Sequence, residues 1–149
     1  MTRLYPIALM LMTALTALPA QAADWRYILT NSDNMTIHVD YDSLKRHSFT
    51  SGGRYYTAWT KWTYPSAQKL LNGKLYRERI DFEYFDCSNQ KGDFDAIYLY
   101  TSTGQSVDSW TLPVSTTSSA NWRRVIPDTV GAATLDSVCS LARQKFGSI

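Results

Sequence analysis

The chain has 149 residues, a formal net charge of +2 at pH 7 and 44% hydrophobic residues, which fits one domain with a buried core. The low net charge argues against nucleic acid as a partner, because contact with phosphates normally requires a strongly basic surface. Five Trp and ten Tyr indicate a chain rich in β-strands, in which aromatic residues are enriched.

Residues 1–22 have the features of a secretory signal peptide. Arg3 supplies a positive charge, residues 7–18 are apolar, and Ala-Gln-Ala at 20–22 is a cleavage site. The apolar stretch is shorter than the roughly 20 residues that span a bilayer, and we expect no transmembrane segment. The first residue after the cleavage site is Ala23 and not a cysteine, so we expect no lipid anchor. We therefore expect residues 23–149 to be an exported domain, either periplasmic or secreted.

Most of the exported part reads as β-structure. Runs of aromatic and β-branched residues alternate with short turn sequences rich in Ser, Asp, Asn and Gly, which is typical of an antiparallel sheet. The predicted strands are residues 25–31, 35–41, 54–65, 75–87, 94–102 and 105–112. Residues 42–46 predict a single helical turn capped by Asp42, and Pro65 is expected to end the third strand because it lacks a backbone N–H. Residues 123–127 form at most a short strand.

The C-terminal segment has helical periodicity. Its apolar residues repeat with the spacing of one helix face and are Leu135, Val138, Cys139, Ala142 and Phe146. Asp128 or Thr129 can cap the start of this helix, and Gly147 can end it. The sequence therefore predicts an α+β fold, with a single antiparallel sheet of about six strands and a C-terminal helix packed on one face.

Cys87 and Cys139 are the only two cysteines, and they could form a redox pair, part of a metal site or a disulfide. A catalytic redox pair is normally spaced Cys-x-x-Cys. A zinc site needs further ligands, and neither His38 nor His47 stands at a spacing typical of a metal motif. In an exported chain two cysteines are most simply a structural disulfide, which would link the helix to the sheet.

Alternation along residues 75–87 raises a question about Cys87. Strict alternation places Cys87 with the charged side chains of this strand and not with its aromatic ones. If Cys87 points into the core, a bulge or strand end near Phe85 and Asp86 must shift the register.

The chain shows no convincing set of catalytic residues. His38 lies on a wet strand face and His47 near a turn, and no nucleophile elbow, metalloprotease helix or glycine-rich phosphate loop is present. Asp81 and Glu83 share a strand face, but the arginines beside them favour cross-strand ion pairs over an acid pair. We expect no enzyme activity, no cofactor and no metal site.

Aromatic residues suggest a binding surface instead. Trp59 and Trp62 lie on opposite faces of their predicted strand, and a single helix covers only one face. Some aromatic rings therefore stay exposed, where they can bind a partner. The predicted binding surface consists of Trp59, Lys61, Trp62, Arg77 and Arg79. Alternatively, the exposed rings pack against a second sheet or in a homodimer.

Several short motifs occur in a familiar order. They are "MTIHVDYDSL" (35–44), "AWTKW" (58–62), "YFDC" (84–87), Tyr98 and Tyr100 before Gly104, and "NWRRVIPDTVGAATLDSVC" (121–139). In this order the chain resembles the bacterial surface-adhesin protein E family. The resemblance implies a flattened antiparallel sheet with a disulfide-linked C-terminal helix, a fold that is often dimeric, and adhesion to host matrix and plasma glycoproteins.

Two functional hypotheses follow. The first is an exported, non-enzymatic, adhesin-like module that binds a protein or glycoprotein partner. The second is a soluble periplasmic domain for interaction or envelope maintenance, without an adhesive role. A fold by itself does not transfer a function.

Overall fold

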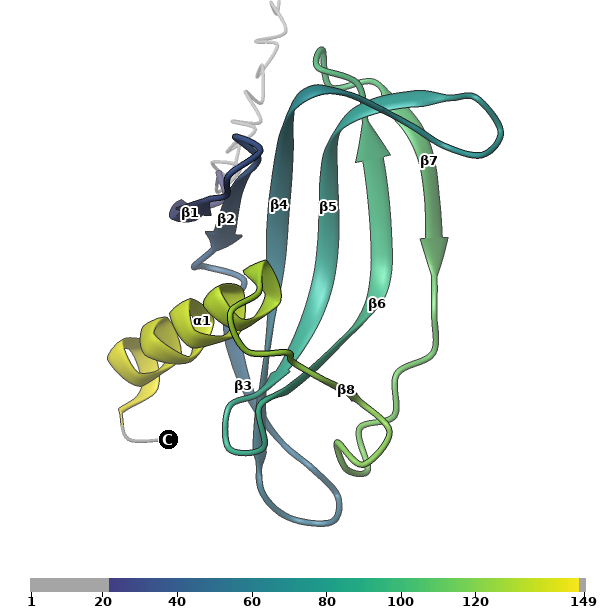
Figure 1. The fold of residues 1–149 in the computed structure, drawn as a ribbon. Helices are drawn as coiled ribbons and strands as arrows, with labels where there is room; N and C mark the ends of the chain where they lie inside the picture. The colour runs from purple at the N-terminus through teal and green to yellow at the C-terminus, as the bar shows by residue number, and fades with distance from the viewer. Residues whose placement is uncertain (1–21, 148–149) are drawn as a thin grey trace, which may run out of the picture.

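The computed structural model describes residues 22–147 (Figure 1). The predicted signal peptide lies outside the described residues except for Ala22. The described chain forms an antiparallel sheet followed by a C-terminal helix, which confirms the predicted α+β fold.

Eight strands form one sheet in this part of the chain. They are β1 (Trp25–Thr30), β2 (Thr36–Asp40), β3 (Lys45–Ser48), β4 (Arg54–Lys69), β5 (Leu75–Asp86), β6 (Lys91–Tyr100), β7 (Ser106–Thr111) and β8 (Arg123–Arg124). The main path is β1-β2-β4-β5-β6-β7, with β3 paired to β4 and β8 paired to β6. The six predicted strands make this path, and the two short strands extend it.

The helical turn predicted at residues 42–46 is wrong. Residues Lys45 to Ser48 form β3, which pairs with Thr57 to Arg54 of β4. β2 pairs with β4 only from Thr63 to Thr60, so the preceding part of β4 offers free backbone groups to β3. A partner in the sheet thus outweighs the local helical signal.

The sequence had suggested that Pro65 ends its strand, but it does not. β4 continues to Lys69, but its pairing with β5 is interrupted between Thr63 and Gln68. Pro65 therefore lies where no ladder hydrogen bond is required. The Arg77 side chain donates to the carbonyl oxygens of Tyr64 and Pro65 in this gap.

The helix α1 (Val130–Phe146) begins and ends as predicted. The Thr129 hydroxyl accepts a hydrogen bond from the backbone N–H of Ala132, and Gly147 caps the C-terminus with a positive φ of 84°. The predicted Cys87–Cys139 disulfide is present, with Cα atoms 5.8 Å apart and a separation of 52 residues. It links α1 to the chain just after β5.

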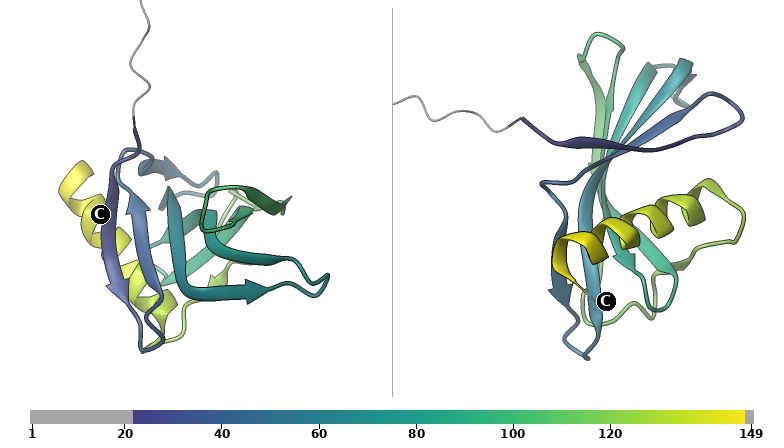
Figure 2. Two further views of the ribbon diagram at one scale, coloured as in Figure 1. Left: turned by 90° about the horizontal axis from the view of Figure 1, so that it is seen from above. Right: turned by 90° about the vertical axis from the view of Figure 1, so that its left-hand side faces the viewer.

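The main core lies between α1 and one face of the sheet. Figure 2 shows the helix crossing this face near one end of the long strands, so that their other ends extend past it. The buried residues of this core are Val39, Leu44, Tyr56, Ala58, Phe85, Leu135, Val138, Cys139 and Ala142. We call this the helix-side face.

The charged side of β5 faces the helix. Phe85 pairs with Tyr56, and Glu83 pairs with Ala58, so these residues point to the helix-side face, as do Asp81 and Arg79 by alternation. The shift of register expected near Phe85 and Asp86 does not occur, because β5 pairs regularly with β4 up to Phe85 and ends at Asp86. No register shift within β5 is needed, because Cys87 already has the parity of the helix-side face.

A second, smaller core covers the same end of the opposite face. Phe49, Tyr55 and Trp122 are buried together, with Tyr84 packed against them. The indole of Trp122 donates to the carbonyl oxygen of Ser115 at 2.9 Å. The long connection between β7 and β8 therefore closes this end of the second face and leaves its other end uncovered by any element of the described chain.

Candidate binding face of the sheet

The uncovered part of the second face is aromatic. Trp59 pairs with Phe82 and Lys61 with Ile80 across β4 and β5, while Ile80 pairs with Tyr98 of β6. Their side chains point away from the helix by alternation. We call this surface the open face, and its residues are Trp25, His38, Trp59, Lys61, Ile80, Phe82, Tyr98 and Tyr100.

The aromatic rings of the open face support one another. The ring of Trp59 lies 4.9 Å from that of Phe82 and 5.9 Å from that of Tyr98, measured between centroids. Phe82 contacts Tyr84 at 5.6 Å, and Tyr84 contacts the buried Trp122 at 5.7 Å. The half-buried rings of Trp59, Phe82 and Tyr98 are thus continuous with a buried cluster, which fixes their orientation.

Two shallow cavities, both wide open to the surface, lie on this face. One has a volume of about 400 Å³ and is lined by Ala23, Trp25, Asp40, Trp59, Ile80, Tyr98 and Tyr100. The other has about 300 Å³ and is lined by Trp59, Phe82, Asp95, Ala96, Tyr98, Thr111 and Leu112. Trp59 and Tyr98 line both cavities, which are therefore adjacent, and we call the two together the groove. Each of the two volumes is at the lower end of the range for small-ligand sites.

Charged groups flank the groove. The Lys61 ammonium lies 4.5 Å from the centroid of the Trp25 ring, a cation–π contact. Asp40 is only 8% exposed, and its Oδ1 accepts hydrogen bonds from the backbone N–H groups of Asp24 and Asp42. The pKa of His38 is lowered by burial and by the Lys61 charge, so His38 is uncharged at neutral pH.

The predicted binding residues divide between the two faces. Trp59 and Lys61 lie together on the open face, whereas Trp62 and Arg79 pair with each other on the helix-side face. Arg77 has the same parity as Arg79. The prediction that the two tryptophans lie on opposite faces is confirmed, but the five residues do not form one surface.

The residues on the helix-side face are engaged within the chain. The Arg79 guanidinium contacts the Asp81 carboxylate through Nε at 2.8 Å and through a terminal nitrogen at 2.5 Å. It also lies 5.8 Å from the Trp62 ring. Arg77 donates to carbonyl oxygens of β4. These contacts leave the two arginines less free to bind a partner than their sequence positions suggested.

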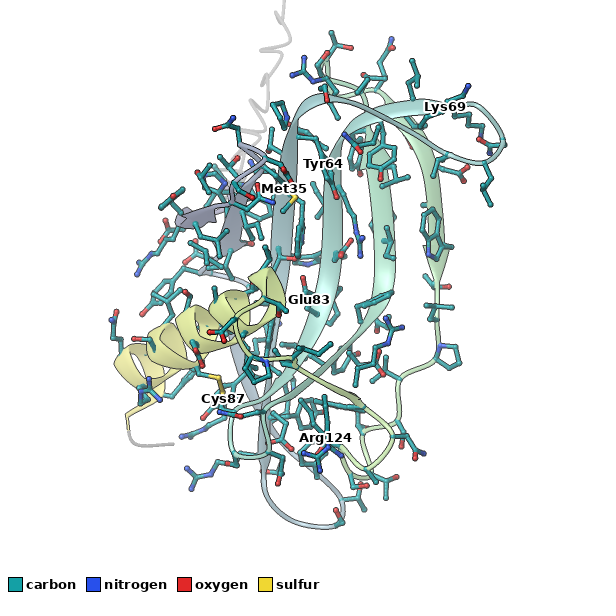
Figure 3. All side chains as sticks on the ribbon, viewed as in Figure 1. Met35, Tyr64, Lys69, Glu83, Cys87 and Arg124 are labelled. Atoms are coloured by element: carbon teal, nitrogen blue, oxygen red, sulfur yellow. A yellow bond between two sulfur atoms is a disulfide. The ribbon has the colours of Figure 1, made fainter. Side chains whose placement is uncertain are left out.

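Glu83 is a feature that the sequence did not reveal. The Thr60 hydroxyl donates to its Oε1 at 2.5 Å, and the Trp62 indole donates to Thr60 at 3.1 Å. Burial, together with the charge of Asp81, raises the pKa of Glu83 to about 7. Figure 3 shows Glu83 beside one end of the helix, where it lines a cavity of about 130 Å³ with Gly131 and Thr134. Alternation predicted that Asp81 and Glu83 share a face, but only the tertiary structure places Glu83 beside the helix.

The histidines do not meet an acid or a nucleophile that would suggest catalysis. His47 Nε2 lies 2.9 Å from the Thr57 hydroxyl, and His38 contacts Tyr27 edge-on. Within residues 22–147 no group of His, Cys, Asp and Glu could hold a metal ion. The absence of enzyme activity stays a prediction.

The comparisons with known proteins now decide the family. The family model described as surface-adhesin protein E matches residues 25–140. The chain belongs to the surface-adhesin protein E family. The match runs from the first residue of β1 into α1 and includes both cysteines of the disulfide. No curated protein and no solved structure matches the chain.

Membership of the surface-adhesin protein E family makes this an adhesin-like protein and points to an exported or surface location. Among the described residues, none of the helical structure is both long and apolar enough to cross a membrane.

Proposed function

We propose that this member of the surface-adhesin protein E family is an exported, non-enzymatic module that binds a protein or glycoprotein partner on its open face. The observation that carries the proposal is the aromatic groove centred on Trp59 and Tyr98, on the sheet face that α1 leaves free. Tryptophan and tyrosine are enriched at interfaces because they bury a large area and keep a polar group for hydrogen bonding.

Trp59 and Lys61 are the proposed centre of this surface. Trp59 joins the two cavities, and Lys61 is held over Trp25 at the edge of the first one. The alternative binding surface, on the helix-side face, consists of Trp62, Arg77 and Arg79. Their contacts with Asp81, Thr60 and backbone carbonyls favour a structural role.

A binding assay with variants of both faces tests this choice. Residues 23–149 are purified and passed over an immobilised extract of extracellular-matrix glycoproteins. Trp59→Ala is expected to weaken binding about 30-fold, the effect of losing a central aromatic worth about 2 kcal/mol. Trp62→Ala is the matched control and should bind like the wild type if it stays folded. Loss of binding in Trp62→Ala or Arg79→Ala, with Trp59→Ala unaffected, would assign the site to the helix-side face.

The location of the protein separates adhesion from the periplasmic alternative. We propose that residues 1–22 direct export and that the mature domain reaches the cell surface. Protease treatment of intact cells should then remove the protein. Protection from protease, together with release by osmotic shock, would favour a periplasmic domain without an adhesive role.

A homodimer through the open face is also testable. If a second copy covers the groove, the purified protein will sediment as a dimer, and Trp59→Ala will sediment as a monomer. That result would contradict a free binding face.

A further inference from the structure

We propose that the groove of the open face binds a neutral oligosaccharide chain, with sugar rings seated on both sides of the Trp59–Tyr98 pair. The inference rests on the proposed function and specifies it, because it assigns recognition to the glycan of a glycoprotein partner and not to its polypeptide.

The shape of the groove fits a chain of small rings. The two cavities, of about 400 and 300 Å³, meet at Trp59 and Tyr98. Their walls are mainly aromatic and aliphatic, with few polar groups. Aromatic ring faces carry negative partial charge, and the C–H groups on the face of a sugar ring are weakly positive and apolar. Flat rings on either side of a shared pair can therefore hold successive sugar units.

A carboxylate at each cavity can receive hydroxyl groups. Asp40 is more than nine-tenths buried and lines the first cavity. Its Oδ1 accepts hydrogen bonds from two backbone N–H groups. In the second cavity Asp95 accepts from the Tyr84 hydroxyl through Oδ2 at 2.7 Å. Ionised carboxylates accept several hydrogen bonds, so both acids can bind sugar hydroxyls.

The charge of the groove favours a neutral ligand. Lys61 lies over Trp25, which lines the first cavity, and Asp40 and Asp95 supply negative charge. A cationic ligand would meet Lys61, and an anionic ligand would meet the two carboxylates. A neutral polyhydroxyl chain meets neither repulsion.

An extended polypeptide fits this face less well. Peptides that add to a sheet use free backbone groups at a strand edge. In the groove the backbones of β4, β5 and β6 are paired with one another, so only side chains face the ligand. This arrangement lacks the main-chain hydrogen bonds that usually hold an extended peptide.

Titration with defined sugars tests the inference directly. Chitotriose, cellotriose, maltotriose and N-acetyllactosamine are added in turn to the wild-type domain, and the indole N–H signals are followed by NMR. We expect at least one sugar to shift the signals of Trp25 and Trp59 in a saturable manner, with Trp110 and Trp122 unchanged. The absence of such shifts with every sugar at millimolar concentration would overturn the inference.

Variants place the site on the groove. Trp59→Ala should weaken sugar binding about 30-fold, and Asp40→Asn about tenfold, because a charged acceptor is lost. Trp110→Ala is the matched control, since Trp110 is exposed but pairs with Ile97 and so lies on the helix-side face. Equal loss in Trp110→Ala, or unchanged sugar binding in both groove variants, would contradict the assignment.

Removal of glycans from the matrix extract separates this inference from the proposed function. Binding that disappears after enzymatic deglycosylation supports both. Binding that persists, but is still lost in Trp59→Ala, keeps the proposed function and overturns the glycan inference. If the intact extract is not bound at all, the matrix-binding function fails, and the sugar titration alone decides the inference.

Discussion

The side chains of Asp81 and Glu83 have unequal partners, although they lie two residues apart on the same strand. Asp81 is 1% exposed and is paired with the Arg79 guanidinium. Glu83 accepts a hydrogen bond from Thr60 but has no arginine of its own, and burial raises its pKa to about 7. At the acidic side of neutral pH the folded protein therefore holds Glu83 largely in its protonated form.

This environment predicts a pH-dependent stability. The pKa of Glu83 is raised in the folded state from an ordinary 4.5 to about 7, so its favourable contribution is fully present below pH 4.5 and is lost as the pH rises through 7. The loss is at most about 3 kcal/mol. Burial also raises the pKa of Asp81, which acts in the same direction.

Glu83→Gln removes the ionisation but keeps the hydrogen-bond acceptor for Thr60. Urea unfolding of both proteins between pH 4 and 8 should show similar stability at pH 4 and an increasing advantage of the variant up to about pH 7. A difference between the two proteins that stays constant over this range would show that Glu83 ionises as it does in the unfolded chain.

The C-terminal helix is the element that most depends on a covalent link. Its buried side packs on β4 and β5, and Cys139 on that side is bonded to Cys87. At its last turn the Lys145 ammonium donates to the carbonyl oxygen of Tyr41. The disulfide and this contact hold the middle and the end of α1 against separate parts of the sheet.

Replacement of both cysteines, Cys87→Ala with Cys139→Ala, should lower the free energy of unfolding by about 4 kcal/mol, because the unfolded chain is no longer closed into a 52-residue loop. Urea unfolding measures the change. Reductant should weaken the wild type by a similar amount and leave the double variant unchanged. A loss below about 1 kcal/mol would indicate that packing alone holds the helix.

On the scale of the whole molecule, both faces of the sheet are covered at one end and open at the other. α1 covers one face, and the connection carrying Trp122 covers the corresponding part of the second face. The open ends of the strands therefore extend from an end of the sheet that is packed on both faces. This division lets one part of the sheet supply stability while the groove stays accessible.

Replacement of Trp122 tests how much the covered end of the sheet contributes to stability. It is 4% exposed and contacts Phe49 and Tyr55, with ring centroids 5.2 and 5.6 Å away. Trp122→Ala should lower the free energy of unfolding by about 3–5 kcal/mol, the usual cost of removing a large buried ring. Trp110→Ala, at a site 40% exposed, should change it by about 0.5 kcal/mol or less. If urea unfolding shows that Trp122→Ala loses as little stability as Trp110→Ala, the second core contributes little.

The strands of the main path, the helix with its Thr129 and Gly147 ends, and the pairing of Cys87 with Cys139 could all be predicted from the amino-acid sequence. Alternation, capping and the oxidising compartment depend on near neighbours or on composition, and both are readable in one chain. It also predicted that Trp59 and Trp62 lie on opposite faces.

Tertiary structure alone decided which face the helix covers. Charged and aromatic side chains alternate along β5, and α1 packs on the side of Phe85 and the charged residues, where the Cys87–Cys139 disulfide also holds it. The same choice leaves Trp59 and Lys61 accessible and places Glu83 beside the helix. β3 and the passage of β4 through Pro65 likewise depended on partners distant in sequence. Local sequence patterns indicate which side chains lie on each side of a strand, whereas tertiary packing decides which side the helix covers.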